Sequence, residues 1–271
     1  MKKFQFGDAK MAIGNKFKRI VVKIGTSTLT HETGKLNLRR IETLARVLSD
    51  IKNAGSEVIL VSSGAVSAGV AKIGFHRPTC TKEKQALAAV GQNEIMKIYG
   101  KFFSMFGHPI AQLLLTKDVI DSASRRAAAE DTLETLLSMG CVPIINENDS
   151  VSCYEIDFGG NDRLSACVGL LVKADIVINL TDIDGYYDSD PRKNPDAKLI
   201  REVETVTDEM IENAGGAGTE RGTGGMQAKL IAAQMLEDAK IPMMIVCGTD
   251  PEILYEVLDG TATGTYFKGG K

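Results

Sequence analysis

Two patterns of apolar positions alternate along the chain. The segment RIVVKI at residues 19–24 is mostly apolar and β-branched, which predicts a buried strand ending at Gly25. Residues 38–51 carry apolar side chains every three or four positions, which predicts an amphipathic helix, and Gly55 is a typical residue to follow its end. Residues 57–61 return to the strand pattern. The chain therefore starts with a strand, a helix and a second strand.

The same alternation continues to the end of the chain, less regularly in the second half. It predicts a helical stretch after residues 62–65 and further helices near residues 82–105, 124–139, 162–171 and 226–239. Further strands are predicted near residues 110–115, 142–145, 176–180, 243–246 and 264–267. Nearly continuous apolar strands separated by helices are typical of a mostly parallel sheet with both faces covered. We therefore expect an α/β fold.

Composition supports a folded chain with one main domain. Residues 1–18 are polar and lack a regular pattern, and we expect them to be an N-terminal extension. Residues 19–271 contain no low-complexity linker and no repeat, so we expect a single domain there. A hydrophobic content of 44% and a charged content of 25% are ordinary for a globular protein, and they exclude a disordered or coiled-coil chain.

Charge and targeting signals narrow the class of protein. The 32 lysine and arginine residues against 35 aspartate and glutamate residues leave a net charge of −3, so the basic excess typical of nonspecific nucleic-acid binding is missing. The chain has no signal-peptide core and no apolar stretch of membrane-spanning length. Its five cysteines are scattered without a CxxC pair, which is typical of reduced thiols. We expect a cytoplasmic protein that binds small molecules and neither nucleic acid nor membrane.

Polar side chains cluster directly after four of the predicted strands. The clusters occupy residues 23–27, 62–65, 146–149 and 181–182. Each cluster alone could be a turn or a helix cap. Because parallel α/β sheets bind ligands beyond the carboxyl ends of their strands, the four clusters together predict a ligand site at that edge.

Two lysines are candidates for binding phosphate. The chain lacks the GxxxxGK[ST] motif and has no GxGxxG after a strand, so neither a P-loop nor a simple dinucleotide site fits. The segment GTGGM at residues 222–226 opens a helix that carries Lys229, and such a helix start attracts phosphate. Lys229 could equally lie on a solvated helix face. Lys23 lies among valine and isoleucine residues, where a charge is costly without an anionic partner.

Six motifs, in this order and spacing, carry a family resemblance. They are VVKIGTS, VSSGA, INENDSV, GGNDRLSA, LTDIDGYY followed by DPR, and GTGGMQAKL. Together they resemble the amino-acid-kinase family over residues 19–267, and the INEND and TGGM motifs are the specific ones. The resemblance implies a three-layer αβα sandwich around a mostly parallel central sheet of about eight strands. It also implies a substrate lobe in the N-terminal half and an ATP lobe in the C-terminal half.

The resemblance implies transfer of the γ-phosphoryl group of ATP, with Mg²⁺ on its phosphates, to the γ-carboxylate of L-glutamate in proline biosynthesis. It implies that Lys23 and Lys229 supply positive charge and that Asp162 orients both ammonium groups. The implied ATP-binding residues are Lys23, Gly25, Thr181, Asp182, Thr223, Gly224, Gly225, Met226, Gln227, Ala228 and Lys229. The implied substrate-binding residues are Ser63, Gly64, Ala65, Asp149 and Asn161.

Free glutamate also carries an α-ammonium group that needs an acceptor. Asp149 is the natural acceptor, although an aspartate at this point could instead belong to an Asx turn. Two positions depart from the family pattern, namely Gly160, where the family often has aspartate, and Asp157, where a lysine can occur. Both lie near the expected substrate lid and bear on the handling of glutamate.

The family also implies partners. Its members assemble as homodimers or homotetramers, proline inhibits them, and a reductase that forms glutamate semialdehyde is a plausible partner. Many bacterial members add a PUA domain, which we do not expect here because the sequence stops at Lys271.

Three other functions compete with this interpretation. One is a kinase of the same fold that acts on another acyl or phosphate acceptor. Another is a catalytically silent binding protein, which the presence of Lys23, Asp162 and Lys229 argues against. The third is a nicotinamide-dependent oxidoreductase, for which the GxGxxG fingerprint is missing.

Overall fold

The strands and long helices form where the apolar pattern predicts them. The computed structural model describes residues 17–152, 160–214 and 225–270. In chain order the elements are β1 (Arg19–Ile24), α1 (Thr26–Leu29), α2 (Leu38–Asn53), β2 (Glu57–Ser62), α3 (Ala65–Ile73), α4 (Thr81–Met105), β3 (Ile110–Leu115), α5 (Lys117–Asp121), α6 (Ala123–Ser138), β4 (Val142–Glu147), α7 (Asn161–Leu171), β5 (Ile176–Thr181), β6 (Tyr186–Tyr187), β7 (Leu199–Ile200), β8 (Glu202–Val203), α8 (Asp208–Asn213), α9 (Met226–Glu237), β9 (Met243–Cys247), α10 (Ile253–Asp259) and β10 (Gly264–Phe267).

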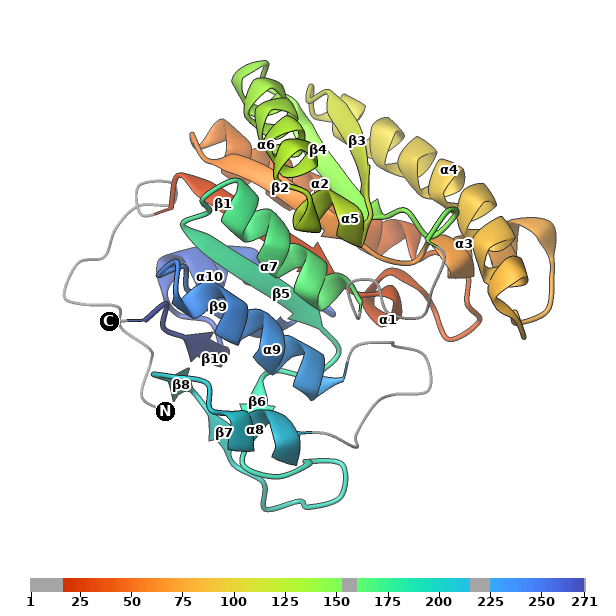
Figure 1. Cartoon of the computed structure of the whole chain (residues 1–271). Coiled ribbons are helices and arrows are strands. Elements are labelled where there is room, and N and C mark those ends of the chain that lie inside the picture. Colours follow the sequence, from red (N-terminus) through yellow and green to blue (C-terminus); the bar gives the residue numbers. More distant parts are fainter. Residues whose placement is uncertain (1–16, 153–159, 215–224, 271) are drawn as a thin grey trace.

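Eight strands form the central sheet in the order β3-β4-β2-β1-β5-β9-β10-β8 (Figure 1). All neighbouring strands are parallel except β9 and β10, which are antiparallel. A separate two-stranded sheet pairs β6 with β7. The prediction of a mostly parallel sheet of about eight strands is confirmed.

Helices cover both faces of this sheet, as the three-layer prediction requires. Successive side chains of a strand point to opposite faces. On β1, Ile20, Val22 and Ile24 therefore join one apolar core with α2, α4 and α10. Val21 joins a second core with α6, α7 and α9, and α7 and α9 lie side by side over β1, β5 and β9 (Figure 1). The side chain at position 23 follows Val21 onto the α7 and α9 face.

Helices α3 and α4 approach each other closely because two glycines lie at their contact. A Cβ atom built on Gly69 would lie 2.0 Å from the Leu87 backbone oxygen, and one on Gly91 would lie 1.8 Å from the Ala65 backbone oxygen. No larger residue fits at either position without separating the helices. The contact fixes the start of α3, which follows directly on β2.

The packed structure begins earlier than the predicted boundary of the extension. Phe17 is buried in the core, and its carbonyl oxygen accepts a hydrogen bond of 2.8 Å from the Ser56 hydroxyl. The backbone N–H of Lys18 donates to Asp175 Oδ2 at 2.6 Å. Residues 17 and 18 therefore pack with the domain, whereas residues 1–16 lie outside the described part of the chain.

Several short elements were not predicted. They are α1, α5, α8, α10, β6, β7 and β8, and each has between two and seven residues. Such lengths are too short for a hydrophobic period to be visible. In the part of the chain that the structure describes, no helix combines the length and the apolar character that crossing a membrane requires.

We expect Gly91→Ala to lower the free energy of unfolding by about 2 kcal/mol or more, because the added methyl group collides with the backbone of α3. Gly100→Ala is the matched control in the same helix, since its Cβ would lie 3.7 Å from Ile110 Cδ1, which is ordinary contact. This control should stabilise the protein by up to about 1 kcal/mol, because alanine favours a helix over glycine. Urea unfolding followed by circular dichroism measures both. Equal effects would contradict the close contact.

Candidate active site

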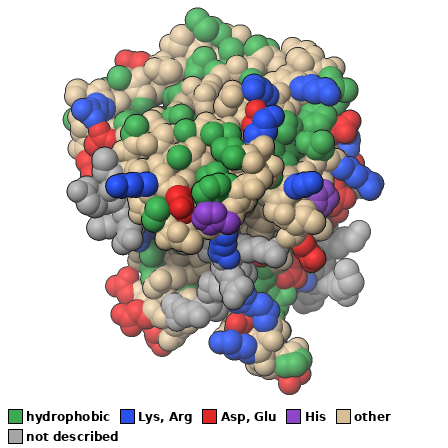
Figure 2. Space-filling view, turned by 90° about the vertical axis from the view of Figure 1, so that its right-hand side faces the viewer, with side chains coloured by type: hydrophobic (Ala, Val, Ile, Leu, Met, Phe, Trp, Pro, Cys, Tyr) green, Lys and Arg blue, Asp and Glu red, His purple; other side chains and the backbone are tan. Residues whose placement is uncertain are grey.

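Four helices begin with a glycine at the N-cap position. The N-caps of α1, α3, α7 and α9 are Gly25, Gly64, Gly160 and Gly225, and none provides a side-chain hydrogen bond to the first turn. Helix starts of this kind keep N–H groups and a partial positive charge available for an anion. Helices α1 and α3 follow directly on β1 and β2, so their starts lie at the carboxyl edge of the sheet. In Figure 2 this edge faces the viewer, and lysine and arginine side chains are spread over the visible described surface instead of forming one basic patch.

Lys23 is held in the sheet one residue before β1 ends. In the strand registers it lies beside Val61 of β2 and Asn179 of β5. Its residue is 5% exposed, so its ammonium group is removed from water. A Cβ atom built on Gly25 would lie 3.7 Å from Lys23 Nζ, which shows that the backbone of Gly25 passes close to this ammonium group.

Asp162 brings the two predicted lysines together. Lys23 Nζ donates to Asp162 Oδ1 at 2.7 Å, and Lys229 Nζ donates to Asp162 Oδ2 at 3.2 Å. Asp162 lies in the first turn of α7 and Lys229 in the first turn of α9, and both residues are buried. The structure thus joins three residues that are 67 or more positions apart in sequence.

The electrostatics of this cluster follow from burial and charge. Burial lowers the pKa of Lys23, and the Asp162 carboxylate opposes that effect. Burial by itself would raise the pKa of Asp162, but the charges of Lys23 and Lys229 hold it below its ordinary value. The carboxylate is therefore ionised at neutral pH. The charge of Asp182 also opposes the effect of burial on the pKa of Lys23, so a second carboxylate acts on this ammonium group.

A second polar network lies next to this cluster. Asn161 Nδ2 donates to Ser63 Oγ at 2.7 Å and to Asn146 Oδ1 at 2.9 Å. Asn146 Nδ2 in turn donates to Gln92 Oε1 at 3.0 Å. The network connects the residues that follow β2 with the end of β4, the start of α7 and the middle of α4. Two predicted residues, Ser63 and Asn161, are therefore in contact.

The remaining predicted residues lie at or near the same edge. Thr181 ends β5 and is buried, and its hydroxyl donates to Asp182 Oδ1 at 3.1 Å. Met226, Gln227 and Ala228 form the first turn of α9 with Lys229. Gly64 and Ala65 begin α3, and Asp149 occupies the turn after β4. Three positions, Thr223, Gly224 and Asp157, lie outside the described residues.

The departure at Gly160 has a backbone explanation. Gly160 has φ 99° and ψ 167°, a conformation that essentially only glycine adopts. It immediately precedes Asn161 and Asp162, which belong to the amide network and the ion cluster respectively. The glycine therefore sets the angle at which the chain enters the first turn of α7.

Two buried polar residues of the site, Asn179 and Gln92, were missed in the sequence, whereas Asn146 belongs to the predicted cluster at residues 146–149. Asn179 Nδ2 donates to Asp162 Oδ1 at 2.5 Å, while Asn146 and Gln92 belong to the amide network. A signal existed for Asn179, because it interrupts an apolar strand as Lys23 does. Gln92 carried no such signal, since a polar residue is ordinary on a long amphipathic helix.

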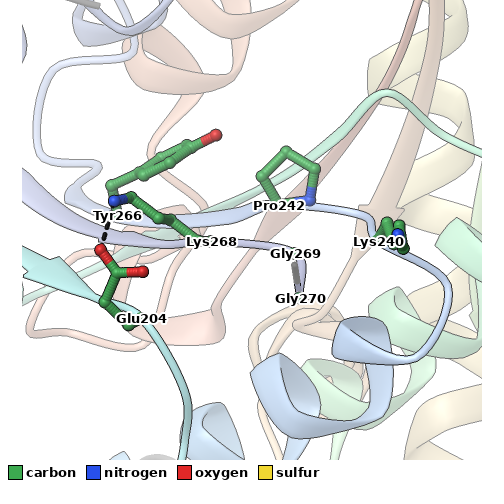
Figure 3. Close-up of a pocket in the computed structure, with 7 residues that line it drawn as sticks. All are labelled: Glu204, Lys240, Pro242, Tyr266, Lys268, Gly269 and Gly270. Carbon is green, nitrogen blue, oxygen red and sulfur yellow. Dashed lines mark hydrogen bonds and ion pairs between the residues drawn. The ribbon is translucent and has the colours of Figure 1, made fainter.

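A pocket of about 390 Å³ lies at the opposite edge of the sheet (Figure 3). Its lining residues are Glu204, Lys240, Pro242, Tyr266, Lys268, Gly269 and Gly270. Lys268 is already paired with Glu202 and Glu204. None of the predicted site residues lines this pocket, so the pocket is not part of the candidate active site.

Comparisons with known proteins identify the family of the chain. The model of the amino acid kinase family matches residues 18–247. The chain therefore belongs to the amino acid kinase family. Glutamate 5-kinase of Clostridium perfringens (strain 13 / Type A) is 52% identical over 259 residues, covering 94% of this chain and 96% of that protein. Glutamate 5-kinase of Listeria innocua (serovar 6a) is 48% identical, covering 94% of each chain.

A solved structure supports the fold. The isopentenyl phosphate kinase of T. acidophilum, in a product complex, superposes with a TM-score of 0.64 and covers 92% of this chain and 99% of that chain. The two sequences are 18% identical, so this likeness concerns the fold alone.

We expect Asp162→Asn to lower the free energy of unfolding at pH 7 by about 3–5 kcal/mol, because two buried ammonium groups lose their counter-ion. Asp131→Asn, on the exposed side of α6, is the matched control and should change stability by less than about 0.5 kcal/mol. Chemical denaturation of each variant gives these values.

The pH dependence has a definite sign. The folded-state pKa of Asp162 lies below its ordinary value. The ionised carboxylate therefore contributes its full share of the free energy of unfolding at pH values above that ordinary value. The contribution is lost as the pH falls through the folded-state pKa. On the acid side of neutrality, the difference in free energy of unfolding between the parent and Asp162→Asn should therefore narrow only below about pH 4. A difference that already vanishes at pH 6 would contradict the ionised carboxylate.

Proposed function

We propose that the protein transfers the γ-phosphoryl group of ATP to the γ-carboxylate of L-glutamate and forms γ-glutamyl phosphate, the first step of proline biosynthesis. The convergence of Lys23 and Lys229 on Asp162, at the carboxyl edge of the sheet, carries this proposal. The names of the relatives supply the acceptor, since the matched proteins from Clostridium perfringens and Listeria innocua are glutamate 5-kinases.

The reaction needs charge stabilisation more than proton transfer. A γ-carboxylate oxygen of glutamate forms a bond to the γ-phosphorus, and the bond from that phosphorus to the β,γ-bridging oxygen breaks. ADP leaves with the electron pair. The nucleophile is already an anion, so no general base has to activate it. The obstacle is the approach of two anions, and preorganised positive charge reduces that obstacle.

Each member of the ion cluster has a role in this proposal. Lys23 and Lys229 neutralise the charge that spreads over the transferred group, while Asp162 holds both ammonium groups without touching substrate. Gly25 contributes a backbone N–H group beside Lys23. Mg²⁺ arrives with ATP as part of the substrate and shields the phosphate oxygens.

The two substrates approach from neighbouring parts of the edge. ATP lies over the end of β5 and the start of α9, beside Thr181, Asp182 and residues 225–229. Glutamate lies over the residues that follow β2 and β4, where Asp149 accepts hydrogen bonds from its α-ammonium group. Ser63, Gly64, Ala65 and Asn161 complete the glutamate site.

The proposal extends to regulation and partners. We place the protein in the cytoplasm as a homodimer or homotetramer, with proline as its feedback inhibitor. Acyl phosphates hydrolyse readily in water, so a reductase that forms glutamate semialdehyde is the natural consumer of the product. The family membership of the chain supports these statements.

We expect Lys23→Met and Lys229→Met each to lower kcat by about 10²–10³, because each removes one preorganised charge from the transition state. Methionine is unbranched like lysine and one atom shorter, so it removes the charge while most of the buried stem keeps its packing. Lys101→Met, on the exposed side of α4, is the matched control and should keep the parental kcat. Hydroxylamine trapping of the acyl phosphate formed from glutamate and MgATP gives the rates. Parental turnover in either buried variant would remove that lysine from the mechanism.

Asp149→Asn tests the recognition of glutamate. We expect the KM for glutamate to rise far more than the KM for ATP, because only glutamate carries the α-ammonium group. Steady-state kinetics with each substrate varied in turn separates the two constants. N-acetylglutamate, acetate and phosphate serve as alternative acceptors, and preference for one of them over glutamate would contradict the proposed substrate. Equal increases in both KM values would contradict the role of Asp149.

A further inference from the structure

Asn179 is a buried amide that touches the central carboxylate of the site. It is the fourth residue of β5, a strand whose six residues are all buried. The strand registers place it beside Lys23 of β1 and Ile245 of β9. Asparagine is disfavoured within strands, and an amide in an apolar layer is costly unless it forms hydrogen bonds. The residue at this position therefore needs an explanation other than the stability of the sheet.

The two polar atoms of this amide differ in their surroundings. Asn179 Nδ2 donates to Asp162 Oδ1 at 2.5 Å, whereas Asn179 Oδ1 is buried and has no hydrogen-bond partner among the described residues. Turning the amide over would bring its oxygen against a carboxylate oxygen, so the hydrogen bond to Asp162 fixes its orientation. An apolar residue would remove the unpaired oxygen. Asparagine therefore carries the cost of one buried oxygen without a partner among the described residues, and the contact of Nδ2 with Asp162 accounts for its presence.

The hydrogen bonds to the Asp162 carboxylate show what Asn179 Nδ2 contributes to the site. Oδ1 accepts from two groups of the sheet, Lys23 and Asn179, while Oδ2 accepts from Lys229 of α9. A carboxylate held by the two lysines alone could turn when either lysine moves toward a substrate. The amide adds a third donor from a rigid strand, and it adds no charge to the cluster.

We propose that Asn179 is a positioning residue that fixes the Asp162 carboxylate, and through it both lysine ammonium groups, in the geometry that phosphoryl transfer requires. This inference rests on the proposed function. Asn179 itself does not touch substrate. Its effect therefore falls on the transition state more than on the binding of either substrate.

Three variants test this role in the full-length protein. Asn179→Leu removes the donor, and Asn179→Asp keeps the shape but replaces the donor with a second carboxylate. Ser165→Ala is the matched control, because the buried Ser165 hydroxyl donates to the backbone carbonyl oxygen of Asp162 at 2.6 Å and not to its carboxylate.

We expect kcat to fall about tenfold in Asn179→Leu, since a hydrogen bond to a charged group is lost, with little change in either KM. The kcat of Asn179→Asp should fall further than that of Asn179→Leu, and Ser165→Ala should keep the parental kcat. The melting temperature of Asn179→Leu should equal or exceed that of the parent. If Asn179 only fills space, the isosteric Asn179→Asp retains more activity than Asn179→Leu, and that order would overturn the proposal. If Asn179→Leu does not fold, parental activity in Asn179→Asp still overturns it.

A titration that does not depend on turnover separates this inference from the proposed function. In protein with ¹³C-labelled aspartate, the carboxyl pKa of Asp162 should be higher in Asn179→Leu than in the parent, because the ionised form loses a donor. Lys23 and Lys229, the charged groups that face Asp162, are the same in both proteins. An unchanged titration would overturn the role of Asn179. A parent that forms no acyl phosphate from glutamate would refute the proposed function, while the titration still decides on Asn179.

Discussion

Two lysine side chains can stay buried in this protein because one aspartate faces both of them. A lone ammonium group in an apolar layer would cost several kcal/mol or give up its proton. Lys23 and Lys229 avoid this by sharing the Asp162 carboxylate. The contact requires β1 to lie beneath α7 and α7 to pack against α9. One carboxylate therefore ties together three elements that are far apart in the chain, and it holds two ammonium groups at fixed positions in the site.

The first turn of α7 connects the two halves of the site. Asn161 bonds toward the residues after β2 and at the end of β4, whereas the adjacent Asp162 bonds toward β1, β5 and α9. Gly160 gives the chain the backbone angle with which it enters this turn. In the proposed reaction the acceptor and the donor of the phosphoryl group meet over these two neighbouring residues. A small shift of this turn would disturb both substrates, which explains why so many buried hydrogen bonds converge on it.

Much of the fold was predictable because strands and long helices leave a hydrophobic period in the sequence. Lys23 was predictable as a site residue because a lysine within an apolar strand is energetically costly. Its partner was less visible. The role of Asp162 was inferred from the family motifs, because no local pattern in the sequence shows that α7 crosses the end of β1. Asn179 and Gln92 depend on contacts across the sheet, and short elements such as α1 leave no readable period. The roles given to the site residues remain predictions that kinetics must test.

The most direct test is a crystal structure with MgADP, aluminium fluoride and glutamate. Aluminium fluoride mimics the transferred phosphoryl group in such a complex. If the two lysines serve one transition state, Nζ of Lys23 and Nζ of Lys229 will both lie within about 3 Å of the fluoride ligands while Asp162 still bonds to each lysine. A complex in which either ammonium group points away from the fluoride, or in which glutamate binds at another edge of the sheet, would contradict the account.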